Sequence, residues 1–318
     1  MRRKSLGSIL LVFVFLTVFV NACAPASTPA PTAIPALTES SSGSPLKGRL
    51  LFSRFTEDTH TFTGMFISKP DGSGETTVPM PWTEGGGTWS KSGKEIAVPT
   101  LLEDGRVGTA IIAADGSILR VLSISDTTLN LPCTNWSPDD TRLACTGWDE
   151  SDSSRNGIYA VDASDGGNLQ RLTTQPAGKT DFPGDYSPDG MQFIFKRASG
   201  DEGPGPLMLV DANGGEPRLF YDGQMEGAGQ FAPNGLSVVS STNGVLVVIN
   251  MDGTVLHQIA RDGFFLFGAT WSPDGTRLVF SADTGTYHAE LYTSLPDGTD
   301  LQQVTHTDTN EITVDWGP

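Results

Sequence analysis

Residues 270–280, TWSPDGTRLVF, carry a pattern that returns along most of this 318-residue chain. The pattern is an aromatic residue, a short turn and an apolar strand. Four other segments align with it without gaps: TWSKSGKEIAV (88–98), NWSPDDTRLAC (135–145), DYSPDGMQFIF (185–195) and QFAPNGLSVVS (230–240). The aromatic residues are separated by 47, 50, 45 and 40 residues. Such a repeat indicates a fold built from copies of one supersecondary unit.

Each copy predicts a β-hairpin. Ser-Pro-Asp-Gly favours a type I turn, because Pro suits its second position and Gly tolerates positive φ. In the third unit Asp140 replaces this Gly. A three-residue loop would pair Trp136 with Arg142 and Asn135 with Leu143, so the aromatic and the following Leu would lie on opposite faces. Both faces of the sheet are then expected to be buried, as in a blade between two other blades.

A second hairpin is expected after each first one. Its turns are Asp71-Gly72, Asp115-Gly116, Asp165-Gly166, Asn213-Gly214, Asp252-Gly253 and Asp297-Gly298. Asn-Gly and Asp-Gly between apolar runs are strong hairpin signals. Two hairpins per repeat give four antiparallel strands per unit.

This four-stranded unit resembles the TolB-type propeller repeat, a relative in form of the WD repeat, over roughly residues 48–318. GRLLFSR (48–54) mirrors TRLVFSA (276–282), so the repeats begin at a second strand. ITVDWGP (312–318) supplies the missing first strand and its aromatic, Trp316. The resemblance predicts an all-β, six-bladed β-propeller over residues 47–318, closed by N- and C-terminal strands in the first blade. The alternatives are an open sandwich array or another blade count. TolB proteins also carry an N-terminal α/β domain, and here the linker leads straight into the first blade.

The first 22 residues read as a lipoprotein signal peptide. Arg2, Arg3 and Lys4 precede an apolar run at residues 6–20, which is short for a membrane span. Val20-Asn21-Ala22-Cys23 resembles the lipobox of bacterial lipoproteins, in which the signal is cut before a cysteine that carries the lipid; Asn21 departs from the usual small residue. The resemblance predicts lipidation of Cys23 and attachment to the outer face of a bacterial membrane. The alternative is an ordinary secreted protein with a chance cysteine.

Residues 23–46 are dominated by Pro, Ser, Thr and Ala, with Glu39 as the one acidic residue. Such a segment buries too little apolar surface to fold, and its prolines keep it extended. It is expected to be a linker that holds the propeller away from the membrane.

Composition narrows the classes of ligand. The chain has 20 basic and 37 acidic residues and a net charge of −17, which disfavours nucleic acid because that binding depends on Lys and Arg. Three cysteines exclude a disulfide-dense scaffold and a multi-cysteine metal cluster. A monomeric ring is expected.

The two faces of the ring are expected to differ. The tight turns lie on one face, here called the turn face. The links from second to third strands lie on the other, the variable-loop face, and binding residues favour such loops. These links carry a candidate acidic binding face: Glu57, Asp58, Glu103, Asp104, Asp149, Glu150, Asp152, Asp201, Glu202 and Asp283. An acidic rim would attract a basic peptide, a basic domain or Ca²⁺. The alternative is an ordinary solvated surface.

Cys133 and Cys145 are candidates for a disulfide. The predicted hairpin register places them opposite each other at a separation that a disulfide can bridge, and an exported protein meets oxidising conditions. Two buried free cysteines are the alternative.

No catalytic or metal-binding motif is recognisable. The four histidines lack metal spacing, and the chain has no nucleophile elbow or phosphate-binding loop. The sequence therefore favours a membrane-anchored, non-enzymatic scaffold without a cofactor, which binds a protein or a cell-wall component through its variable-loop face. The alternative is an extracytoplasmic enzyme, or a binder of sugars or cell-wall fragments, that uses the mouth of the central channel.

Overall fold

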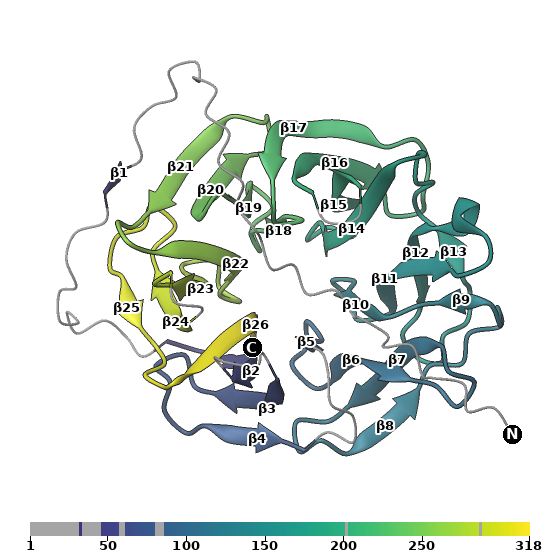
Figure 1. The fold of residues 1–318 in the computed structure, drawn as a ribbon, viewed down its shortest axis with the longest axis horizontal. Helices are drawn as coiled ribbons and strands as arrows, with labels where there is room; N and C mark the ends of the chain where they lie inside the picture. The colour runs from purple at the N-terminus through teal and green to yellow at the C-terminus, as the bar shows by residue number, and fades with distance from the viewer. Residues whose placement is uncertain (1–31, 34–45, 57–60, 80–85, 201–202, 286–287) are drawn as a thin grey trace, which may run out of the picture. The chain divides into compact units, whose positions relative to one another are not determined.

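The computed structural model describes residues 32–33, 46–56, 61–79, 86–200, 203–285 and 288–318. Their strands form six antiparallel blades arranged around a centre, as Figure 1 shows. The predicted all-β, six-bladed propeller is confirmed, including the order of strands within each blade.

The blades are numbered along the chain, and each is given from its inner to its outer strand. Blade 1 contains β26 (Thr309–Gly317), β2 (Arg49–Thr56), β3 (Phe62–Ser68) and β4 (Thr76–Val78). Blade 2 contains β5 (Thr88–Trp89), β6 (Ile96–Leu101), β7 (Val107–Ile112) and β8 (Ile118–Val121). Blade 3 contains β10 (Cys133–Trp136), β11 (Arg142–Asp149), β12 (Gly157–Asp162) and β13 (Gln170–Arg171); β9 (Leu129–Asn130) also pairs with β11, and the 3₁₀ helix η1 (Ser153–Arg155) precedes β12.

The other three blades follow the same order. Blade 4 contains β14 (Lys179–Tyr186), β15 (Gln192–Ser199), β16 (Gly205–Asp211) and β17 (Arg218–Met225). Blade 5 contains β18 (Gln230–Phe231), β19 (Ser237–Thr242), β20 (Val245–Asn250) and β21 (Val255–Ala260), and β1 (Thr32–Ala33) pairs in parallel with β21. Blade 6 contains β22 (Phe265–Trp271), β23 (Leu278–Asp283), β24 (Ala289–Ser294) and β25 (Gln302–Gln303).

Blade 1 closes the ring with both ends of the repeat region. Strand β26 pairs with β2 so that Trp316 lies opposite Leu50, and the indole Nε1 of Trp316 donates a hydrogen bond of 2.9 Å to the carbonyl of Lys47. Gly48 has a φ of +94°, and a Cβ there would lie 2.3 Å from the carbonyl oxygen of Gly317. The close approach of the two ends therefore requires glycine at this position.

The core lies between blades, which explains why both faces of each sheet are apolar. Along β2, Leu51 packs toward the core shared with blade 2, whereas Leu50 and Phe52 pack with Val279 and Leu291 of blade 6. All five side chains are fully buried. Alternate residues of one strand thus join two different cores, and burial of each such side chain stabilises the ring by about 1.5–3 kcal/mol.

The predicted register of the first hairpin is wrong by one residue. Trp136 lies opposite Leu143, not Arg142, because Ser137 donates its backbone N–H to the carbonyl of Arg142 and the loop has four residues, 138–141. The aromatic and the following Leu are therefore cross-strand neighbours on one face. A bulge between Cys133 and Asn135 then brings Cys133 opposite Cys145.

The seam between blades 6 and 1 contains two buried carboxylates. Glu311 on β26 is fully buried, and its Oε1 accepts hydrogen bonds from Arg54 Nε (2.7 Å) and from Thr307 Oγ1 (2.6 Å). Glu290 on β24 accepts the backbone N–H of Thr307 at 2.6 Å, and its Oε2 has no partner among the described residues. Burial, and the charge of Glu290, raise the pKa of Glu311 to about 7 despite the hydrogen bonds that it accepts.

Candidate functional site

The central channel is lined by the residue that precedes each repeat aromatic. In chain order these residues are Thr88, Asn135, Asp185, Gln230, Thr270 and Asp315. All six line one cavity, and all six are polar. They lie on the innermost strands, where the aromatic residue turns into the space between blades and its neighbour faces the centre. We call them the channel ring.

The backbone next to the channel ring is joined from blade to blade. Trp136 Nε1 donates a hydrogen bond of 3.2 Å to the carbonyl of Thr88 in the preceding blade, and Trp271 Nε1 donates one of 3.2 Å to the carbonyl of Gln230. These two tryptophans therefore pack between blades and also fix the backbone of Thr88 and Gln230 in the channel ring.

A collar of prolines surrounds the channel on the turn face. Blades 3 to 6 place a proline at the second position of this turn, and blade 1 has Pro318 at the equivalent position after its aromatic residue. All five prolines line a cavity: Pro138, Pro188, Pro233, Pro273 and Pro318. A Cβ on the turn glycine of one blade would lie within 4 Å of the proline of the preceding blade at Gly190, Gly235 and Gly275. Neighbouring turns are thus in contact around the collar. Blade 2 has Lys91 instead of proline.

Lys91 is held in place by the residue that breaks the pattern in the next blade. Unlike proline, Lys91 has a backbone N–H, which donates a hydrogen bond of 2.6 Å to Asp140 Oδ1, and Ser92 N–H donates one of 2.9 Å to Asp140 Oδ2. Asp140 occupies the position of the turn glycine and adopts a φ of 59°. The two departures from the repeat pattern compensate each other across the boundary between blades.

The ammonium of Lys91 reaches across the channel to blade 4. Its Nζ donates a hydrogen bond of 3.2 Å to Asp185 Oδ1, while Asp315 Oδ2 accepts the backbone N–H of Trp89 at 2.7 Å. The Asp185 side chain is 10% exposed and that of Lys91 is 44% exposed, because the lysine stands in the channel rather than in the core. Burial raises the pKa of Asp185 and of Asp315. Burial by itself would lower the pKa of the Lys91 ammonium. The negative charges of Asp185 and Asp315 have the larger combined effect, so the pKa of Lys91 is raised.

These charged residues divide the channel into two cavities of about 250 Å³ each. One cavity lies on the turn face and is bounded by the proline collar; we call it the turn-side cavity. The other lies on the opposite side of the channel ring, and we call it the loop-side cavity. It is bounded by small residues, among them Gly227, Gly268 and Ser241. Both cavities share Trp89, Lys91, Asp185, Gln230, Thr270 and Asp315 as lining residues. Each is therefore a concave surface that ends at the same charged group.

This arrangement suits binding of a polar or cationic group. Two carboxylates face one ammonium, so the group carries a net negative charge when all three are ionised, and the walls around it lower the effective dielectric constant. Within the described ranges, no group of three or more His, Cys, Asp or Glu side chains is placed to hold a metal ion. The expectation of Ca²⁺ at the acidic loops stays untested.

The predicted acidic face consists partly of carboxylates that already have partners. Asp149 is buried at the end of β11, where its oxygens accept hydrogen bonds from Ser151, Thr128 and Arg155, and these interactions hold the pKa of Asp149 well below its usual range. Asp104 forms an ion pair of 2.7 Å with Arg106. These two residues order their own loops.

The remaining predicted acids are placed as follows. Asp152 caps η1 through Ser154, Asp283 accepts the backbone N–H of Gly285, Glu150 accepts the indole N–H of Trp148, and Glu103 is exposed. Glu57, Asp58, Asp201 and Glu202 lie outside the described residues, as do Cys23 and the predicted signal peptide. No helix within the described ranges is long and apolar enough to cross a membrane.

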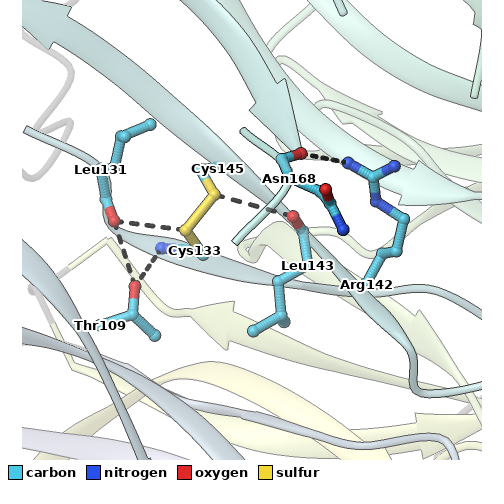
Figure 2. Close-up of a disulfide and its surroundings, with 7 residues drawn as sticks. All are labelled: Thr109, Leu131, Cys133, Arg142, Leu143, Cys145 and Asn168. Atoms are coloured by element: carbon cyan, nitrogen blue, oxygen red, sulfur yellow. Dashed lines mark hydrogen bonds between the residues drawn. A yellow bond between two sulfur atoms is a disulfide. The ribbon is translucent and has the colours of Figure 1, made fainter. Parts of the chain in front are cut away.

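Cys133 and Cys145 are joined as a disulfide between β10 and β11, shown in Figure 2. Both residues are fully buried. The backbone N–H of Cys133 donates a hydrogen bond of 2.7 Å to Thr109 Oγ1, which in turn donates one of 3.1 Å to the carbonyl of Leu131. The disulfide thus lies within blade 3, and the backbone of Cys133 also contacts β7 of blade 2.

The channel ring and Lys91 were missed by motif searching, although the repeat alignment contains the signal for both. The residue before the aromatic is polar in every copy. A position that faced an apolar core would not be polar in all six copies, so this pattern indicates a position that faces the channel. Lysine replaces proline in one copy only, and that copy is followed by the one in which aspartate replaces glycine.

Comparisons with solved structures agree with the fold. TolB from Acinetobacter baumannii superposes with a TM-score of 0.66 at 19% identity, over 85% of this chain and 67% of that one. A putative TolB from Agrobacterium tumefaciens gives 0.60 at 15% identity, over 86% and 99%. A gluconolactonase from Xanthomonas campestris gives 0.53 at 17% identity, over 79% and 87%. No family model and no curated protein matches the chain. The chain therefore has a TolB-type propeller fold.

Proposed function

We propose that this protein is an exported, lipid-anchored, non-enzymatic scaffold that binds a segment of another envelope macromolecule at the variable-loop face. The observation that carries the proposal is the loop-side cavity. It lies on the side of the channel ring away from the proline collar, is bordered by glycine and serine, and ends at Lys91, Asp185 and Asp315. A concave surface with a few convergent polar groups is the usual form of a binding site.

The anchor and the linker predicted from the sequence would suit this role. A lipid on Cys23 and an extended linker would keep the ring at the membrane surface while leaving its faces free to meet a partner. The resemblance to TolB structures supports the fold of such a scaffold, and the partner is to be found by experiment. Replacement of Cys23 by alanine should release the protein from the membrane fraction if the anchor is correct.

Capture of the partner by residues 47–318 tests the proposal. The variant Asn135→Trp would fill the loop-side cavity, because Asn135 is a member of the channel ring and only partly buried. Leu119→Trp is the matched control, since Leu119 is 49% exposed on β8 at the outer edge of blade 2. We expect Asn135→Trp to lose the partner captured from envelope extracts and Leu119→Trp to retain it. Equal capture by both variants would contradict the proposal.

A second candidate is binding or conversion of a small ligand in the channel. It is favoured by the buried carboxyl groups of Asp185 and Asp315, whose raised pKa values are typical of functional sites. The gluconolactonase has the same general fold, which makes sugar-derived ligands a reasonable first set for a thermal-shift screen. A shift that is lost in Asn135→Trp would favour this candidate.

A further inference from the structure

The Lys91 ammonium lies beside Asp185 in the channel, at a position that suits a cation. Lys91 stands where the other blades have proline, and it projects into the channel rather than forming part of the collar. Its ammonium meets Asp185 of blade 4, a residue that lies 94 positions further along the chain. The contact therefore arises from the ring itself and not from a local turn.

The position of this lysine is built by the neighbouring blade. Asp140 accepts the backbone N–H groups of both Lys91 and Ser92 and thereby fixes the turn from which the side chain extends. A glycine would adopt the positive φ of Asp140 without steric cost, but it would offer no acceptor. The aspartate is thus explained by the need to hold the Lys91 turn.

The charges around the ammonium exceed what one lysine neutralises. Asp185 and Asp315 face the channel from blades 4 and 1, and Asp140 attracts the ammonium from the turn of blade 3. Both cavities end at Lys91, so a side chain that enters from either face meets this group before any other charge that lines the channel.

We propose that Asp185 and Asp315 form a receptor position for a primary ammonium or guanidinium group of the binding partner, and that Lys91 occupies this position in the free protein. The inference rests on the proposed function, which supplies the partner segment. Binding would exchange one cation for another: the incoming group takes over the contact with Asp185, and the Lys91 side chain moves into the solvent of the turn-side cavity.

A pair of blocked tripeptides tests the proposal without knowledge of the partner. Acetyl-Gly-Lys-Gly-amide carries the cation, and the same peptide with norleucine in place of lysine is its uncharged match. Titrations of residues 47–318 in buffer with EDTA compare the unaltered protein with Lys91→Met, which removes the competing ammonium and keeps the length of the side chain. We expect Lys91→Met to bind the lysine peptide at least tenfold more tightly than the unaltered protein, with no gain for the norleucine peptide.

Two further variants keep the test decisive. Lys94→Met removes an exposed lysine from the same turn and should behave as the unaltered protein. Asp140→Gly leaves Lys91 and both carboxylates in place but loosens the turn, so it should increase the affinity for the lysine peptide by a smaller factor. This second variant serves if Lys91→Met fails to fold. In the Lys91→Met protein, Asp185→Asn should abolish the gain.

The outcomes separate this inference from the proposed function. If neither Lys91→Met nor Asp140→Gly increases binding of the lysine peptide, or if norleucine binds equally well, the receptor position is wrong, whereas capture of the partner can still depend on Asn135. If the lysine peptide binds as expected but Asn135→Trp retains the partner, the receptor position stands and the proposed partner surface is wrong.

Discussion

Asp140 Oδ1 accepts a hydrogen bond of 2.6 Å from the backbone N–H of Lys91, across the boundary between blades 3 and 2. This contact joins the only turn of the collar that lacks proline to the only aligned turn in which aspartate replaces the glycine. Lys91 and Asp140 therefore act as a pair, and the effects of mutating them on stability should depend on each other.

We predict that Asp140→Gly destabilises the protein by about 1 kcal/mol, because two backbone donors lose their acceptor while the positive φ is relieved. In a Lys91→Pro background the same change should cost less, since proline has no N–H and only the Ser92 N–H then loses its acceptor. Urea unfolding of the four proteins in this cycle measures the coupling. Equal effects of Asp140→Gly in both backgrounds would show that the contact has no energetic role.

Glu311 predicts a pH dependence of stability. Its pKa is raised to about 7 in the folded protein, above the ordinary value of 4.5, so the folded state binds this proton more tightly than the unfolded state. The stability that it contributes is present below pH 4.5 and is lost as the pH rises to 7. The melting temperature of Glu311→Gln should therefore decline less than that of the unaltered protein across this interval.

Glu216→Gln is the matched control for this prediction, because Glu216 is an exposed glutamate in the link between β16 and β17. Its melting curve should follow that of the unaltered protein at every pH. Parallel pH profiles for Glu311→Gln and the unaltered protein would remove Glu311 as the titrating group.

How far the sequence predicts this structure depends on whether a feature is local to one repeat. Blade number, strand order and the closure by Trp316 follow from turn chemistry and the period of the repeats. The predicted pairing of Trp136 is wrong by one residue because it assumes a three-residue loop. The length of the loop depends on whether Ser137 pairs with Arg142, and the residue types in the turn do not reveal this. The Lys91–Asp185 contact depends on ring geometry and joins blades that are not neighbours, so no local pattern could predict it.

The disulfide predicts a specific redox behaviour. Because Cys133 and Cys145 are joined by a disulfide, protein purified without reductant should show no free thiol from this pair, either in the folded state or after unfolding. Replacement of both by alanine should cost about 2 kcal/mol of the free energy of unfolding, since the bond closes a short loop. Thiol titration in denaturant distinguishes the two states, and two free thiols would refute the bond.

The carboxylates of the variable-loop face should separate into two groups. Glu103→Lys and Glu150→Lys change exposed charges and should leave the melting temperature nearly unchanged. Asp149→Asn should lower it clearly, because Asp149 is buried and binds Ser151, Thr128 and Arg155. If the exposed acids contribute to partner binding, the double charge reversal weakens capture while the fold is retained. Unchanged capture would assign binding to the channel alone.

Site-specific photo-crosslinking in intact cells tests whether a partner segment enters the loop-side cavity. A short diazirine amino acid at Thr134, which lines that cavity, is compared with the same probe at Leu119 on the outer strand of blade 2. We expect one discrete crosslinked product from position 134 that disappears in the Asn135→Trp protein, and none from position 119. A product from position 119 alone, or a product from position 134 that persists with the cavity filled, would contradict it.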